Sequence, residues 1–149
     1  MTDVRADIDA LLREAEAGGP KAALAARRAA WLAESRDPER ARKALRLAAR
    51  LEPFDSGPRL ALSRLHAEAG DLDAARQEAE AVVREAVDQA ARARASFILG
   101  ELARARGEPE EARDAYQTVI EIEEALLGED QLNPHAARWY ARARGRIRR

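Results

Sequence analysis

The sequence contains no cysteine and few aromatic residues. The absence of cysteine excludes disulfide bonds, thiolate metal sites and catalysis by a cysteine nucleophile. Because aromatic residues make up only 4% of the 149 residues, a core must be built from Ala, Leu, Val and Ile. Core residues this small predict helices that approach one another closely.

The sequence also lacks long apolar runs and an excess of charge of either sign. Apolar stretches such as Phe97-Ile98-Leu99 are far shorter than the roughly 20 residues needed to cross a bilayer. The N-terminal residues include Asp3 and Asp7 and show no export signal, so a cytoplasmic location is expected. The 26 basic and 27 acidic residues nearly cancel, so net charge indicates no class of partner.

A turn sequence recurs three times along the chain. Its copies begin at Arg36, Gly70 and Gly107, and a small residue follows each at Ala41, Ala75 and Ala112, with spacings of 34 and 37 residues. Repetition at this period is typical of a helical solenoid.

Proline positions and apolar spacing predict the helices between these turns. Pro20, Pro38, Pro58, Pro109 and Pro134 each suit the first position of a helix, where the missing N–H needs no partner. Apolar residues recur at helical intervals, and no strand pattern is present. We predict one all-α domain with helices at about 3–17, 20–35, 38–51, 57–69, 72–87, 89–106, 109–127 and 134–147. Because the connecting turns are short, neighbouring helices must pack antiparallel as hairpins.

The third repeat resembles a tetratricopeptide repeat. The resemblance rests on the spacing of Leu99-Gly100, Gly107, Ala112, Tyr116 and Val119. It implies a right-handed superhelical solenoid with repeats at 22–55, 56–92 and 93–130, capped by the helices at 3–17 and 134–147.

The first and third repeats depart from the family pattern. Arg28-Ala29 stands where Leu-Gly is expected, although Leu24, Trp31 and Leu32 still provide an apolar face for packing. The third repeat is extended before Asn133-Pro134, which predicts a tilted last helix.

Members of this family bind peptides or protein segments in a concave groove, so the resemblance implies a non-catalytic adaptor or chaperone-like module. The expected groove residues are Arg27, Glu34, Leu60, Arg64, Glu68, Arg94, Phe97, Ile98, Glu101 and Arg104. The arginines can pair with acidic groups of a partner, and Leu60 and Phe97 can seat an apolar anchor. The only asparagine, Asn133, lies outside the groove, so the family's Lys/Asn carboxylate clamp is not expected. Self-association is a rival use of the same surface.

The sequence gives little support for catalysis or a cofactor. His66 and His135 are the only histidines and lie far apart in the chain, which excludes a multi-histidine metal site. Asp71 with Asp73, and Glu121 with Glu124, fit helix capping and solvated charge better than cation binding. We therefore expect no enzyme activity, no metal and no cofactor, unless the chain is a regulatory part of a larger enzyme.

Weak nucleic-acid binding remains an alternative because the C-terminal helix is rich in arginine. Trp139 and Tyr140 lie at helical spacing with apolar neighbours, so we expect them to dock this helix onto the third repeat. The arginines that could contact phosphate are Arg138, Arg142, Arg144, Arg146, Arg148 and Arg149.

Overall fold

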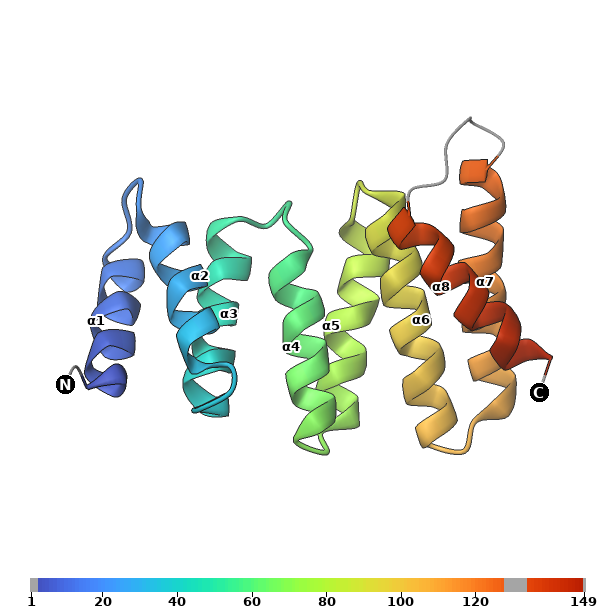
Figure 1. Ribbon diagram of the computed structural model, residues 1–149, viewed down its shortest axis with the longest axis horizontal. Coiled ribbons are helices and arrows are strands. Elements are labelled where there is room, and N and C mark those ends of the chain that lie inside the picture. The colour runs from blue at the N-terminus through green and yellow to red at the C-terminus, as the bar shows by residue number, and fades with distance from the viewer. Residues whose placement is uncertain (1–2, 128–133, 149) are drawn as a thin grey trace. The chain divides into compact units, whose positions relative to one another are not determined.

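The computed structural model describes the backbone of residues 3–127 and 134–148, and the side chains of residues 3–126 and 141–148. Over this part of the chain there are eight α-helices and no β-strand (Figure 1). The helices are α1 (Val4–Ala17), α2 (Ala22–Ala33), α3 (Pro38–Leu51), α4 (Gly57–Glu68), α5 (Leu72–Glu85), α6 (Gln89–Ala105), α7 (Pro109–Leu127) and α8 (Pro134–Ile147). The predicted all-helical fold is therefore confirmed.

Aspartates begin several of these helices. The side chains of Asp3, Asp37, Asp71 and Asp88 each accept a hydrogen bond from a backbone N–H in the first turn of the helix that follows. These N–H groups have no partner within the helix, so the caps stabilise the helix starts. The predicted cap at Asn133 lies outside the described residues.

The glycine turns share one geometry. Gly70 and Gly107 have positive φ angles of 83° and 75°. After α4 the Asp71 N–H donates to the His66 carbonyl oxygen at 2.9 Å, and after α6 the Glu108 N–H donates to the Ala103 carbonyl oxygen at 2.9 Å. This pattern is a Schellman motif, which ends a helix on a left-handed residue and favours glycine there.

The turn between α1 and α2 differs from the prediction. Gly18 and Gly19 both have positive φ, and Pro20 lies in the turn that they form, so α2 begins at Ala22. Pro20 as a first helical residue is therefore wrong, because two successive left-handed residues delay the start of the helix. Pro58 is likewise the second residue of α4 rather than the first.

The chain divides into two compact units, residues 1–65 (unit 1) and residues 66–149 (unit 2). The division falls within α4, inside the second expected repeat. The predicted repeat and cap boundaries remain predictions.

Unit 1 is built around α2, which packs against both α1 and α3. The buried face of α2 consists entirely of alanines, and it meets Ile8 and Leu12 of α1 and Leu45 of α3 in one core. Because alanine side chains are short, the three helix backbones can lie close together. The buried alanines of α2 are Ala22, Ala25, Ala26, Ala29, Ala30 and Ala33.

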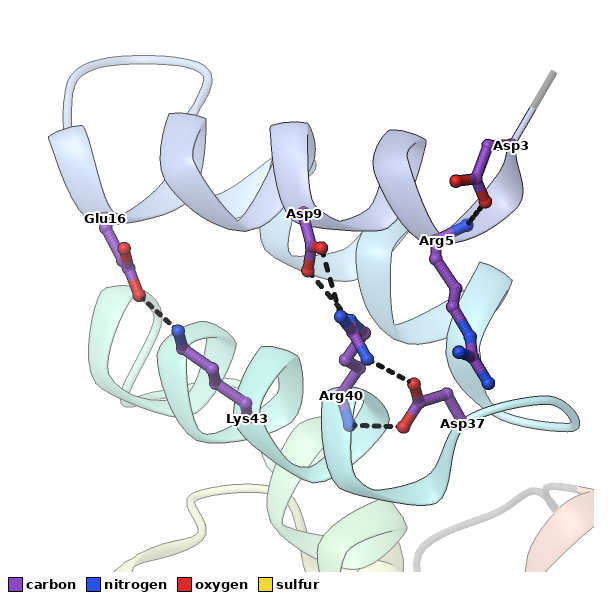
Figure 2. Close-up of polar contacts among 7 residues, drawn as sticks. All are labelled: Asp3, Arg5, Asp9, Glu16, Asp37, Arg40 and Lys43. Atoms are coloured by element: carbon purple, nitrogen blue, oxygen red, sulfur yellow. Dashed lines mark hydrogen bonds and ion pairs between the residues drawn. The ribbon is translucent and has the colours of Figure 1, made fainter.

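Charged contacts hold α1 against α3 in unit 1 (Figure 2). The Arg40 guanidinium donates to both carboxylate oxygens of Asp9, from Nε at 2.8 Å and from Nη2 at 3.1 Å, and donates to Asp37 from Nη1 at 2.6 Å. Lys43 forms an ion pair with Glu16 at 2.9 Å. The hydrogen bonds from Arg40 lower the pKa of both Asp9 and Asp37. These bridges fix the position of α1 along α3.

The structure overturns the predicted packing of Trp31. This side chain is 73% exposed, and Leu24, two turns earlier on α2, is also exposed. The predicted apolar packing face of α2 is therefore wrong for these two residues. The buried face is the alanine face, because it alone allows the close approach of α1 and α3.

Unit 2 is built around α6, which packs against α5, α7 and α8. Gly100 of α6 faces the Tyr116 ring of α7, and Phe97 packs on the same ring with centroids 5.7 Å apart. Figure 1 shows α8 lying obliquely across α6 and α7. The side chains of Trp139 and Tyr140, expected to dock α8, lie outside the described residues.

Candidate functional site

The expected groove residues of unit 1 lie on α2 and α4, and their charged members pair with neighbours. Arg27 of α2 forms an ion pair with Glu52, which follows α3, and Glu34 pairs with Arg64 of α4. Leu60 is buried and so offers little surface to a partner. The charges at these positions therefore link the helices of unit 1 to each other.

The expected groove residues of unit 2 lie mostly on α6. Arg94 and Arg104 are exposed, Ile98 is half-buried, and Glu68 is exposed at the end of α4. Phe97 is buried against Tyr116, which leaves only part of its ring to line a surface. Glu101 accepts a hydrogen bond from Arg146 Nε of α8 at 3.0 Å. The last helix therefore covers part of the predicted groove face.

A pocket of about 620 Å³ lies between α6 and α8. Phe97 and Glu101 line it from α6, while four residues line it from α8. Its walls thus combine an aromatic ring with groups of both charges. The α8 residues are Ala141, Arg142, Gly145 and Arg146. We call this the α6–α8 pocket.

Gly145 leaves room in this pocket. A Cβ atom built on Gly145 meets no heavy atom within 4 Å, whereas one built on Gly100 would lie 2.5 Å from Tyr116 Cε1. The two glycines therefore have different roles: Gly100 permits close packing of α6 on α7, and Gly145 leaves space in the pocket because it has no side chain.

Burial shifts the pKa of two acids in α7. Burial raises the pKa of Tyr116, and the nearby negative charge of Glu101 adds to the effect. Glu123 is 2% exposed, its Oε1 has no hydrogen-bond partner, and burial raises the pKa of its carboxyl group. A buried, unpaired carboxylate is costly, so this site favours the protonated form.

Sequence reasoning missed the burial of Glu123, which lies in an acidic run that reads as solvated. A signal was present, since Tyr116, Ile120 and Glu123 follow the i, i+4, i+7 spacing of one helix face. The first two of these are buried as well.

A smaller pocket of about 180 Å³ lies among α5, α6 and α7 of unit 2. Beside it Arg106 forms an ion pair with Asp73, which lowers the pKa of that carboxyl group. Glu108 lies close to Glu111 and raises the pKa of the Glu111 carboxyl group. The Arg106–Asp73 pair joins the end of α6 to the start of α5.

The described residues hold no group of three or more histidine, aspartate or glutamate side chains placed to bind a metal ion. His66 is half-buried on α4, and the side chain of His135 lies outside the described part. No helix among the described residues is long and apolar enough to span a membrane.

Two arginines of α8 are engaged within unit 2. Arg144 donates to Glu124 at 3.2 Å, and Arg146 donates to Glu101. These pairings reduce the positive charge that α8 can offer to phosphate groups.

Antiparallel helix hairpins and an interhelical pocket define a helical-repeat protein. Residues 93–126 match the family model of the tetratricopeptide repeat, which confirms the predicted resemblance over the third repeat. A search of curated protein sequences finds no match.

One solved structure supports the same fold over almost the full chain. The crystal structure of MamA matches with a TM-score of 0.57 and 16% sequence identity. The match covers 97% of this chain and 91% of that chain. At this identity the likeness extends to the fold alone.

Proposed function

We propose that this chain is a non-catalytic adaptor or chaperone-like module that holds a segment of another protein in the α6–α8 pocket. The pocket itself is the observation that carries the proposal, since it adjoins the matched repeat and has both apolar and charged walls. Tetratricopeptide repeats generally mediate protein–protein interactions. The cytoplasmic location expected from the sequence remains a prediction.

The lining suggests what kind of segment enters. Phe97 offers part of an aromatic ring, while Arg142 and Arg146 place guanidinium groups at the α8 side. Arg146 already shares its charge with Glu101 at 3.0 Å. In a segment with an apolar side chain next to a carboxylate, the apolar side chain can pack on the Phe97 ring, while the carboxylate accepts hydrogen bonds from the guanidinium groups on α8.

Filling the pocket tests the proposal. Gly145→Trp places a large side chain on the pocket wall, and Gly145→Ala is the matched control because it adds only a Cβ in open space. A photo-crosslinking residue at the exposed pocket position Ala141 captures what enters, and the same residue at Arg113, exposed on α7 outside both pockets, is the background.

We expect crosslinks from position 141, mapped by mass spectrometry in an extract of the source cells, to converge on one segment of another protein. They should survive Gly145→Ala and disappear with Gly145→Trp. Equal crosslinking from positions 141 and 113, or crosslinks that Gly145→Trp leaves intact, would contradict the proposed function.

A further inference from the structure

Most of the exposed large apolar side chains belong to unit 1. Among the described residues, five large hydrophobic side chains are exposed, and four of them belong to α2 or to the end of α3 and the loop after it. These four are Leu24, Trp31, Leu51 and Phe54; the fifth, Val87, follows α5. Trp31 and Phe54 are 73% and 90% exposed. An exposed tryptophan is costly to leave in water and is the residue type most enriched at binding hot spots.

An ion pair joins the two parts of this surface. Arg27 lies between Leu24 and Trp31 on α2, and its partner Glu52 lies between Leu51 and Phe54 in the chain. The pair holds the exposed face of α2 next to the end of α3. We call Leu24, Arg28 and Trp31 of α2, together with Leu51 and Phe54 at and after the end of α3, the α2 face.

Among the described residues around the α2 face, more arginines than carboxylates lack an ion-pair partner. Two nearby carboxylates are neutralised in ion pairs, Glu52 by Arg27 and Glu34 by Arg64, while Asp55 accepts a hydrogen bond from the Gly57 N–H at 2.9 Å and keeps its charge. Arg28 and Arg50 form no hydrogen bond or ion pair within the described part of the chain. These two arginines against the one charged carboxylate of Asp55 leave a net positive charge for a partner.

Helix geometry gives the shape of the partner. Leu24, Arg28 and Trp31 are spaced i, i+4, i+7, so they form one stripe about 10 Å long on α2. A second helix with apolar residues at the same spacing can lie along this stripe, and carboxylates on its flanks can reach Arg28.

We propose that the α2 face docks an acidic amphipathic helix of a partner protein. The inference rests on the proposed protein-binding function and assigns it a second surface, in unit 1, with a partner of defined chemistry. Charge repulsion disfavours a second copy of this chain as the partner. An antiparallel two-fold pairing of α2 with itself places the two Arg28 side chains on the same side of the helix–helix interface.

The test uses Trp31 as the reporter. Trp139→Phe leaves Trp31 as the only tryptophan of the full chain. The probe is a synthetic amphipathic helix of about 15 residues, long enough to form with helix-favouring residues, carrying leucines at i, i+4 and i+7 and glutamates on both flanks. A second peptide with lysine in place of every glutamate is the charge control.

Docking should shift Trp31 emission to shorter wavelength in a saturable way, and the lysine peptide should bind at least about tenfold more weakly. By anisotropy of the labelled glutamate peptide, Trp31→Ala and Arg28→Glu should each weaken binding by about tenfold or more. The matched controls are Val87→Ala, which removes an exposed apolar side chain elsewhere, and Arg46→Glu, which reverses an exposed arginine on α3. Both controls should bind as the parent does.

Equal binding of the two peptides, no saturable shift, or equal effects of the control variants would overturn the proposal. So would a shift that grows with protein concentration without peptide and is lost on dilution, because it would assign the α2 face to self-association. Circular dichroism melts confirm that the variants fold. Failure here leaves the α6–α8 pocket test intact, because that test reads crosslinks from position 141 and the pocket contains no residue of the α2 face.

Discussion

Gly100→Ala should destabilise unit 2 because the added methyl group has no room. Its Cβ would lie 2.5, 2.7 and 2.9 Å from Cε1, Cδ1 and Cζ of Tyr116. The ring cannot swing away, since Tyr116 is buried and packs against Phe97 with an interplanar angle of 50°. Overpacking of this kind costs about 1–3 kcal/mol.

Helix propensity opposes that cost. Alanine in a helix interior is favoured over glycine by about 1 kcal/mol, so the net loss should be about 0–2 kcal/mol. For a chain of this size, each kcal/mol corresponds to a fall of about 3 °C in Tm. Gly145→Ala is the matched control, because its Cβ meets nothing within 4 Å and only the propensity gain remains.

Thermal and urea unfolding of the two variants and the parent separate these effects. Gly100→Ala should melt below the parent, and Gly145→Ala at or above it. In a Tyr116→Leu background the penalty of Gly100→Ala should shrink by about 1 kcal/mol, since the ring edge is gone. Equal stability of the two alanine variants would refute the packing argument.

Three further predictions concern charge and turn geometry. Glu123→Gln should raise stability at pH 7, because the neutral amide avoids the cost of ionising a buried carboxyl group. The folded-state pKa of Glu123 lies above its ordinary value of 4.5, so the stability of the parent should rise as pH falls through the folded-state pKa. Urea unfolding across the acid range should show that the stability of the variant depends less on pH. Arg40→Met should lower Tm at pH 7, because it removes the ion pairs with Asp9 and Asp37. Arg40 lowers the pKa of both carboxyl groups below 3.8, so the difference in Tm between parent and variant should vanish as pH falls below that value. A difference in Tm that persists in strong acid would contradict the ion-pair explanation. Gly107→Ala should cost about 1 kcal/mol by urea unfolding, since φ is 75° there, and an unchanged midpoint would argue against a left-handed turn residue.

The local structure of this protein could be predicted from the sequence because nearby residues determine it. Asp37, Asp71, Gly70 and Gly107 mark helix ends through hydrogen bonds and φ angles that involve only a few neighbouring residues. The repeat at 93–126 was predictable for a related reason: Gly100 and Tyr116 lie on consecutive helices, so their spacing reports their contact.

Only the tertiary structure decided which helix faces are buried. In α2, hydrophobicity suggested that Leu24 and Trp31 pack inside, yet the buried face consists of alanines, because α1 and α3 can approach α2 closely only over short side chains. The position of α8 over Phe97 and Glu101, and the burial of Glu123, likewise depend on elements distant in the sequence. The sequence by itself thus determined the helices, turns and repeat family, whereas the candidate binding surfaces follow from long-range packing that apolar periodicity does not encode.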